Sequence, residues 1–463
     1  DADMKLVAYK VDTVCNLGAY NSGYAQPIQS DLFAKVAMGV YDVQNIALRC
    51  KAYYTTTVQI DAYRGAGRPE AIFALERSMD NAARKLGVDP YELRRKSFIK
   101  PEQFPYQTAI SDTYDVGEFD ALLSAAKVNA DRAGYAARKA ASEAAGKLRG
   151  TGLCYYIESI LGDKKENARV VFEDDGTVSL YVGTQSNGQG HETVYAKFLS
   201  DQSGIPVEAI RIVQGDSDLI AWGGGTGGSR SVTMQTGATL ETVATVKQKF
   251  AAYLGEKFES EDVDFDDERF RIAGSNETPS MLDVAAMARV DGRSDLLDIH
   301  EQFRLSDRSF PNGAHIAEVE IDPETGQVTV DRYSVTDDFG NMINPMLAEG
   351  QVHGGVAQGV GQALSEHVVY DEDGQLLTAT FMDYGMPRAA DLPLIGFETR
   401  PVPSTYNPMG MKGCGEAGTV GALAAIANAV ADAVAPRGVS DIQMPYTPSR
   451  VWAALNQGKI AAE

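Results

Sequence analysis

Four glycine-rich clusters limit what this chain can fold into more than any other feature of its sequence. They cover residues 62–69, 183–191, 223–231 and 410–418, and each stands directly before a segment expected to be helical. The free N–H groups and the dipole of a helix N-terminus attract anions, and glycines let a ligand approach the backbone. Ordinary helix-entry turns explain one such cluster about as well. The recurrence favours several loops that face one anionic ligand.

Composition argues against several classes of protein. The chain has 42 Lys and Arg against 64 Asp and Glu, a formal charge of −22, so no nucleic-acid partner is expected. No run reaches the roughly 18 apolar residues of a membrane helix, so no membrane span is expected. The cysteines form no CxxC pair, which argues against a zinc or iron–sulfur site and favours a reducing, cytoplasmic compartment: they are Cys15, Cys50, Cys154 and Cys414.

The length of 463 residues predicts about three units of roughly 150 residues each. Hairpin patterns alternate with helical patterns, which predicts an α+β fold of several mixed α/β subdomains. We place the limits of the units at 1–149, 150–312 and 313–463. The chain opens on an apolar alternation, which we interpret as the middle of a strand and hence as a fragment, a processed product or a separated subunit.

Within these units the elements follow from periodicity and from turn residues. A strand is expected at 55–60, and hairpins are expected at 168–182 and 316–335. The charged, irregular stretch 258–312 is expected to be a surface insertion. Helices are expected at 69–86, 90–95, 191–203, 230–257, 346–364, 418–435 and 449–456, and within the Ala-rich segment 117–148.

Glu416 is the most informative single residue. It stands among small residues at a helix start, where a confined carboxylate could act as a general base. The other interpretation, favoured by residue type alone, is a Glu of the first helical turn that the dipole stabilises. Gln351 and Gln358 stand on a helix with many glycines. Close helix packing explains the glycines but not the amides, and a polar ligand remains an equal alternative.

Other catalytic patterns are missing from the sequence. The five histidines form no closely spaced pair, so a His-ligated metal is not expected: they are His191, His300, His315, His353 and His367. Neither the phosphate loop GxxxxGK[ST] nor a complete dinucleotide fingerprint occurs, and no GxSxG elbow indicates a serine hydrolase.

Taken together, several motifs resemble a known family. They are AYRGAGRPEA at 62–71, NGQGHET at 187–193, TGGSRS at 226–231, GQVHGGVAQG at 350–359 and KGCGEAG at 412–418. The chain resembles, over almost its whole length, the C-terminal portion of the molybdopterin-binding large subunit of the xanthine oxidase family of molybdenum hydroxylases. The nearest branch is the large chain of aerobic carbon monoxide dehydrogenase and its relatives.

The resemblance implies a role for particular residues. Glu416 would be the general base, and Arg64 would orient substrate or stabilise charge on it. Either Gln351 or Gln358 would contact the pterin. Further cofactor contacts would come from the glycine-rich clusters, namely Ala62, Tyr63, Gly65, Gly188, Gln189, Gly190, Thr226, Gly228, Ser229, Ser231, Cys414 and Gly415.

The resemblance also implies a reaction and its cofactors. The reaction would be oxidative hydroxylation of an aldehyde or N-heterocycle carbon, with water as the oxygen source. The cofactor would be a molybdenum–molybdopterin, in its cytosine dinucleotide form, while iron–sulfur centres and FAD would reside on partner chains.

The same resemblance implies an assembly. The partners would be an iron–sulfur subunit, a FAD subunit, and either the N-terminal part of the large subunit or a second molybdopterin chain, arranged as a dimer of heteromers. The isolated chain would then be incomplete and inactive.

One departure from the family pattern concerns copper. True carbon monoxide dehydrogenases have a copper-holding cysteine where this chain has Gly65, which puts carbon monoxide oxidation in doubt. Two alternatives stay open: a non-catalytic, cofactor-free binding or assembly protein that keeps the fold, and a carbon monoxide dehydrogenase-like subunit without that cysteine. The substrate itself is not determined by the sequence.

Overall fold

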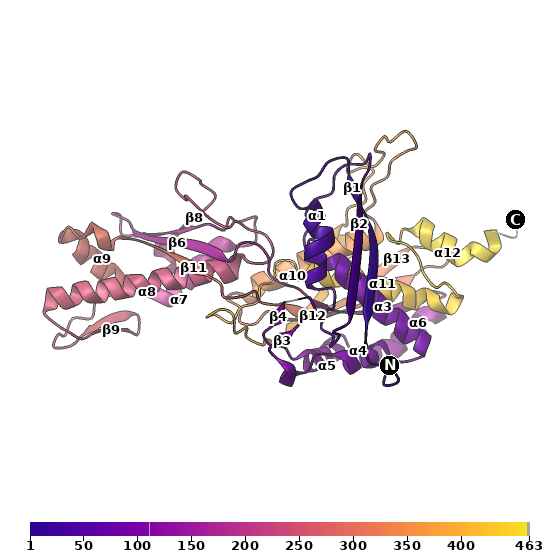
Figure 1. The fold of residues 1–463 in the computed structure, drawn as a ribbon, viewed down its shortest axis with the longest axis horizontal. Helices are drawn as coiled ribbons and strands as arrows, with labels where there is room; N and C mark the ends of the chain where they lie inside the picture. The colour runs from indigo at the N-terminus through magenta and orange to yellow at the C-terminus, as the bar shows by residue number, and fades with distance from the viewer. Residues whose placement is uncertain (111, 461–463) are drawn as a thin grey trace.

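The computed structural model describes residues 1–110 and 112–460 as an elongated α+β molecule with two lobes (Figure 1). Each lobe has its own hydrophobic core. One core gathers residues from both ends of the chain, and the other gathers residues between Ile160 and Leu305. The chain therefore leaves the first lobe for the second and then returns, so that segments distant in sequence meet where the lobes join.

The first lobe is organised by a four-stranded sheet in the order β14-β13-β12-β5. β12 pairs antiparallel with β5 and with β13, whereas β13 and β14 are parallel. The strands are β5 (Leu148–Ile157), β12 (Asn312–Ile321), β13 (Val328–Asp338) and β14 (Ile395–Thr399).

The central helix of this lobe is α11 (Ala417–Val434), which packs against β5, β12, α10 (Pro345–Leu364) and α3 (Arg68–Leu86). A Cβ atom at Gly152 of β5 would lie 2.0 Å from the Ala425 oxygen, so only glycine permits this approach. Such close contact fixes the position of α11 relative to the sheet.

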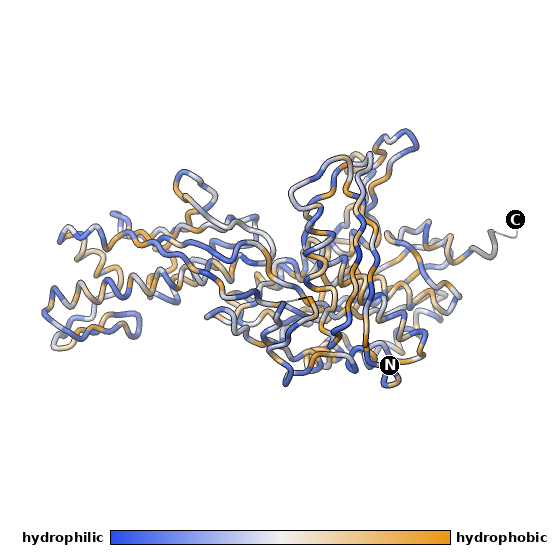
Figure 2. The backbone as a smooth tube through the Cα atoms, viewed as in Figure 1, coloured by the Kyte–Doolittle hydropathy of each residue, from blue (hydrophilic) through white to orange (hydrophobic). Residues whose placement is uncertain are grey.

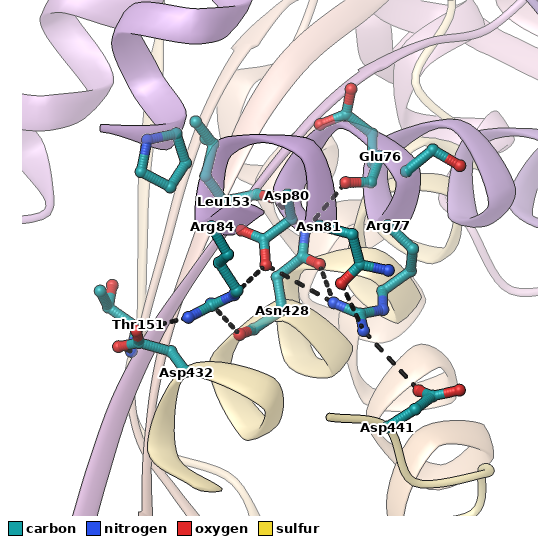
Figure 3. A network of polar contacts seen from close by, with 12 residues as sticks. Glu76, Arg77, Asp80, Asn81, Arg84, Thr151, Leu153, Asn428, Asp432 and Asp441 are labelled. Carbon is teal, nitrogen blue, oxygen red and sulfur yellow. Dashed lines mark hydrogen bonds and ion pairs between the residues drawn. The ribbon is translucent and has the colours of Figure 1, made fainter. Parts of the chain in front are cut away.

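A buried polar network also holds α3 and α11 together (Figure 3). The Asn428 side chain accepts a hydrogen bond from Arg77 at 2.7 Å and donates one to the Leu153 oxygen of β5 at 2.8 Å. Arg84 donates to Asp80 and pairs with Asp432 at 3.0 Å. Because these partners come from α3, α11 and β5, the network ties the three elements into one body.

α11 is also apolar enough for a membrane. The segment Ala417–Arg437 meets the length and hydropathy of a membrane helix, but 89% of its most apolar window is buried inside the lobe. Such burial is typical of a core helix, which is hydrophobic on all sides. The absence of a membrane span stays a prediction from the sequence.

The second lobe contains a four-stranded sheet in the order β11-β6-β7-β8. α8 packs on β6 and β11, and α7 packs on α8 and β8. A small hairpin of β9 and β10 completes the lobe. The elements are β6 (Lys165–Phe172), β7 (Val178–Val182), α7 (His191–Ser203), β8 (Ile210–Val213), α8 (Ser231–Phe258), β9 (Val263–Asp266), β10 (Arg269–Ile272), α9 (Met281–Val290) and β11 (Asp298–Arg304).

The remaining elements lie around the first lobe. β1 and β2 form a separate two-stranded parallel sheet (Figure 1). Figure 2 shows hydrophobic and hydrophilic residues mixed along both strands. The elements are β1 (Tyr9–Gly18), α1 (Ala25–Pro27), α2 (Phe33–Lys35), β2 (Ile46–Tyr54), α4 (Pro90–Ser97), β3 (Tyr106–Gln107), β4 (Thr113–Tyr114), α5 (Phe119–Asn129), α6 (Tyr135–Ala144) and α12 (Pro448–Ile460).

The structure confirms the expected helices and both hairpins, within a few residues at each end. Two expectations are wrong. The stretch 55–60 is not a strand, since β2 ends at Tyr54 and the chain turns there to run past the end of β1. The stretch 258–312 is not an irregular insertion, because β11 pairs with β6 and α9 contributes to the second core. The domain limits stay a prediction, and β5 crosses the limit at 149.

Candidate active site

The four glycine-rich clusters converge where the lobes join. We call them the first (62–69), second (183–191), third (223–231) and fourth (410–418) site loops. Each precedes a helix, namely α3, α7, α8 and α11 in that order. Hydrogen bonds link the first loop to the fourth, the fourth to the third, and the third to the second, so the four loops form one connected site.

Glu416 lies at the centre of this connection, just before α11. Its Oε1 accepts a hydrogen bond from the Gly65 N–H at 2.9 Å and pairs with Arg68 Nη2 at 2.7 Å. Its Oε2 accepts a bond from the Ser229 hydroxyl at 3.0 Å, and the same hydroxyl accepts a bond from the Glu416 N–H. The first, third and fourth site loops therefore meet on one carboxylate, whose side chain keeps 12% exposure.

Close backbone packing makes this meeting possible. A Cβ atom at Gly413 would lie 2.4 Å from the Ser229 oxygen, so the third and fourth site loops touch through their main chains. Lys412 anchors the fourth loop from behind, through a buried ion pair of 2.6 Å with Asp338 at the end of β13. The position of Glu416 thus depends on both lobes.

Arg68 links Glu416 to a second carboxyl group, Glu158. Nη1 of Arg68 bonds Glu158 Oε1 at 3.0 Å and the Ser159 oxygen at 2.6 Å, and Nε bonds the Gly65 oxygen at 2.5 Å. Arg68 and Glu158 are both fully buried. One guanidinium therefore serves two carboxyl groups that arrive from different elements.

The two carboxyl groups respond to this environment in opposite directions. Burial alone would raise the pKa of Glu416, but the Arg68 charge and the bonds from Gly65 and Ser229 outweigh it and lower the pKa. Burial raises the pKa of Glu158 to about 8, against the opposing effect of Arg68. At neutral pH the arrangement therefore favours an ionised Glu416 beside a protonated Glu158.

Arg64 joins the first site loop to the fourth loop and to α10. Its Nε donates to the Gly415 oxygen at 2.5 Å, and its Nη1 donates to the Gln358 side chain at 3.1 Å. Its Nη2 donates to both the main-chain and side-chain oxygens of Gln351, at 2.9 and 3.0 Å. The glutamine amides thus have a protein partner in Arg64. Their contact with a pterin, and that of Arg64 with substrate, remain predictions.

The glycines of α10 have a separate explanation. A Cβ atom at Gly355 would lie 2.8 Å from the Thr419 nitrogen, and one at Gly359 would lie 2.3 Å from the Ala422 Cβ. Close packing of α10 on α11, one of the two interpretations from the sequence, therefore accounts for them.

The third site loop exposes its backbone. The N–H groups of residues 225–229 donate no hydrogen bond to another residue in the described part of the chain. Space is open where a Cβ atom would stand at Gly225 and at Gly227. Arg230 holds the loop from behind, through a 2.9 Å ion pair with Glu166 and a bond to the Gly225 oxygen. Such a run of free N–H groups can bind a phosphate by donating hydrogen bonds to its oxygens.

Thr226 of the third site loop connects it to the second. Its hydroxyl donates a hydrogen bond to the main-chain oxygen of Gln185 and accepts one from the Ser231 hydroxyl. Gln189 contacts the His191 ring at 3.0 Å, and its oxygen accepts the Asn187 N–H.

The glycines of the second and third loops differ in their surroundings. A Cβ atom at Gly188 would meet open space, whereas one at Gly190 would lie 2.8 Å from Leu347 of α10 and one at Gly228 would meet Leu161 at 2.7 Å. Gly188 therefore leaves room for a ligand, while Gly190 and Gly228 permit packing.

Three predicted contacts lie at the edges of the site. Ala62 and Tyr63 are on the exposed end of the first loop. Cys414 is half-exposed beside Glu416, and burial of its sulfur raises the pKa of the thiol to about 12. The thiol is therefore protonated at neutral pH and is not a reactive nucleophile.

Sequence reasoning missed Arg68 and Glu158. Arg68 stands in the AYRGAGRPEA motif, next to the predicted Arg64, but an arginine near a helix start carries no sign of its partners. Glu158 directly follows β5, and a lone acid after an apolar strand was the available signal. Only the tertiary structure shows that these residues converge with Glu416, which is 348 positions from Arg68.

Comparison with known proteins agrees with this geometry. Family models for the molybdopterin cofactor-binding domain match residues 128–393 and 1–98. The chain therefore belongs to the molybdopterin-binding large subunits of the xanthine oxidase family, in the branch that resembles carbon monoxide dehydrogenase.

Individual relatives support the same assignment. The chain is 33% identical to the carbon monoxide dehydrogenase large chain of Hydrogenophaga pseudoflava, over 99% of this chain and 60% of the relative. It is 32% identical to the nicotine 6-hydroxylase large subunit of Paenarthrobacter nicotinovorans, over 97% and 58%. Quinoline 2-oxidoreductase from Pseudomonas putida 86 superposes with a TM-score of 0.92 at 31% identity, over 99% of this chain and 61% of that one. The chain thus spans about 60% of the length of these relatives.

The residues present fit a molybdopterin. The free N–H groups at 225–229 and the open space at Gly188, Gly225 and Gly227 provide a polar, uncrowded cradle for an anionic group. In the described part of the chain, no three His, Cys, Asp or Glu side chains are grouped to hold a metal ion directly.

Proposed function

We propose that this chain forms one side of the active site of a molybdenum hydroxylase and that Glu416 is its general base. The observation that supports this best is the carboxylate of Glu416, held by Arg68, Gly65 and Ser229 where the site loops meet. A general base must be ionised at the working pH, and the lowered pKa of Glu416, in which the Arg68 charge and the hydrogen bonds outweigh burial, meets that requirement.

Each side chain has a task in this proposal. When bound, the molybdenum cofactor would supply the oxidation chemistry. Glu416 would accept the proton of the water-derived hydroxyl group at its carboxylate. The free N–H groups at 225–229, with Thr226 and Ser231, would hold the phosphates of the cofactor, in the cytosine dinucleotide form. Arg64, with Gln351 and Gln358, would keep the first site loop next to the cofactor.

The substrate class we propose is an aldehyde or the carbon of an N-heterocycle. Two relatives named above, nicotine 6-hydroxylase and quinoline 2-oxidoreductase, have names that refer to N-heterocycles. Gly65 supplies no thiol for copper, which argues against carbon monoxide as the substrate. We further propose a cytoplasmic complex, a dimer of heteromers, in which partner chains supply iron–sulfur centres, FAD and the remainder of the cofactor cleft.

The test uses the complex purified with the chains that accompany it in the cell. Metal and pterin analysis should find molybdenum and molybdopterin, and a panel of aldehydes, purines and pyridines should include a substrate. Glu416→Gln should lower kcat by about 10²- to 10⁴-fold, the usual contribution of general acid–base catalysis. Glu318→Gln is the control, because Glu318 of β12 is a buried acid paired with Arg138 and with Arg149, which lies near the start of β5, at the opposite end of that strand from Glu158.

Two outcomes would contradict the proposal in different ways. If the purified complex contained neither molybdenum nor pterin, the chain would be a binding or assembly protein and not part of an enzyme. Turnover within a few-fold of wild type in Glu416→Gln would leave an enzyme whose base is another group.

A further inference from the structure

The shared guanidinium of Arg68 raises the question of how many negative charges it neutralises. Arg68 and Glu158 are fully buried, and Glu416 is almost so. Two ionised carboxylates on one guanidinium would bury a net negative charge, which is costly in a medium of low dielectric constant. One of the two carboxyl groups should therefore carry a proton.

The hydrogen-bond donors around each carboxyl group indicate which of the two carries the proton. Glu416 receives hydrogen bonds from the Gly65 N–H and the Ser229 hydroxyl besides its contact with Arg68. Among the described residues, Glu158 accepts a hydrogen bond from Arg68 at Oε1, while its buried Oε2 has no hydrogen-bond partner. A buried carboxylate with few donors costs more free energy than a neutral carboxylic acid, so the proton belongs on Glu158.

We propose that Glu158 is a positioning residue that, in its protonated form, holds Arg68 against Glu416 and so sets the direction of the Glu416 carboxylate. Glu158 is fully buried, so it acts on the site through its buried neighbours, above all through Arg68. This inference rests on the proposed role of Glu416 as the base.

The surroundings support a neutral Glu158. Burial raises its pKa to about 8, in spite of Arg68 and with help from the charge of Glu416. The other titratable groups that it influences are Asp337 of β13 and Tyr156 of β5, together with Arg64 and Cys414 of the site loops. Burial also raises the pKa of Asp337 and of both weak acids, Tyr156 and Cys414, whereas Arg64 contributes a positive charge.

Ionisation of Glu158 should weaken the site. Above about pH 8 a second negative charge would compete with Glu416 for Arg68. The carboxylate of Glu416 would then lose part of its orientation, and turnover would fall. The pair should titrate as a unit with an alkaline step that belongs to Glu158.

The experiment compares Glu158→Gln and Glu158→Ala in the complete enzyme. The Gln variant keeps the oxygen that accepts from Arg68 and cannot ionise, so it should retain kcat at pH 7 and lose the alkaline step of the pH profile. The Ala variant frees Arg68 and should lower kcat by about 10- to 100-fold with little change in KM, the scale expected for a misplaced group. Glu318→Ala is the matched control, since it breaks another buried Glu–Arg pair, that of Glu318 with Arg149, and should keep the wild-type profile.

A second measurement does not depend on turnover. Infrared difference spectroscopy on the complete enzyme at pH 7 should show a carboxylic acid C=O band that disappears in Glu158→Gln and persists in Glu318→Gln. The inference is overturned if that band persists in Glu158→Gln, if Glu158→Gln is as impaired as Glu158→Ala, or if Glu158→Ala turns over like wild type. A failure of Glu416 as base would appear separately, as turnover retained in Glu416→Gln while the infrared band is still found.

Discussion

Gly65 shows how a single residue limits the chemistry of this site. Its φ is +104°, and a Cβ atom there would lie 2.4 Å from Pro69 Cγ. Residues with a side chain rarely adopt this φ, and Pro69 belongs to the rigid first turn of α3. The same backbone conformation that directs the Gly65 N–H to Glu416 therefore leaves no room for a cysteine side chain at this position.

This geometry predicts that Gly65→Cys will not create a copper site. Strain from the left-handed φ, roughly 1–2 kcal/mol, and the clash with Pro69 should lower the free energy of unfolding by about 2–4 kcal/mol. Thermal unfolding and copper analysis measure the two effects. Gly87→Ala is the control, because Gly87 has a φ of +68° but open space around it, and should lose only the first contribution. A stable Gly65→Cys protein that binds stoichiometric copper would contradict this.

At the scale of elements, the packing of α3 on α11 depends on polar side chains as well as apolar ones. Asn428 is fully buried, and the atoms it bonds belong to α3 and β5. Because α11 begins directly after Glu416, whatever holds α11 also places the candidate base. The network in Figure 3 thus contributes to function from a distance.

Asn428→Ala should therefore destabilise the protein markedly. The change removes the shortest hydrogen bonds of the Leu153 oxygen and of Arg77 Nη1, which keep only longer contacts with Arg94 at 3.4 Å and with Asp80 at 3.5 Å, and it costs about 2–4 kcal/mol in total. Chemical unfolding should show this decrease in the free energy of unfolding. The turnover of the complete enzyme should also fall, because α11 would be held less firmly against α3 and β5. Asn456→Ala on α12 is the control, since Asn456 bonds an oxygen near the surface, and should change stability by less than about 0.5 kcal/mol. Equal stability of the two variants would show that the network is not a structural link.

At the scale of the whole molecule, the site belongs to neither lobe alone. Ser229 stands on the loop before α8 of the second lobe, while Glu416 precedes α11 of the first. Each lobe has a separate hydrophobic core, so each can respond to damage on its own. Hydrogen bonds between the loops, such as that of Ser229 with Glu416, and close packing contacts, such as that of Gly190 with Leu347, couple the two lobes.

Calorimetry of the chain should accordingly resolve two transitions. Phe250→Ala empties space in the second core and Ile426→Ala empties space in the first, at about 3–5 and 2–5 kcal/mol respectively; both residues are fully buried. Each variant should lower the midpoint of one transition and leave the other nearly unchanged. A single transition that both variants shift alike would mean that the lobes unfold as one unit.

Local patterns predicted most elements correctly. Arg68–Leu86 and Ala417–Val434 were identifiable because their starts carry glycines and their interiors follow helical periodicity. The strand expected at 55–60 failed because β-branched residues favour a strand only where a partner strand is present. β11 was missed because only one of its faces is buried, and charged and polar residues occupy the other.

The sequence by itself determined the local geometry of the site loops and the family to which the motifs belong, because glycine conformation and helix starts depend on neighbouring residues. Only the tertiary structure decided the chemistry of the carboxylate at their centre. The Gly65 N–H and Glu416 are 351 positions apart in the chain, and Glu158 adds its carboxyl group from the position directly after β5. A pKa depends on burial and on charges in space, and no pattern in sequence specifies which distant side chains will supply them.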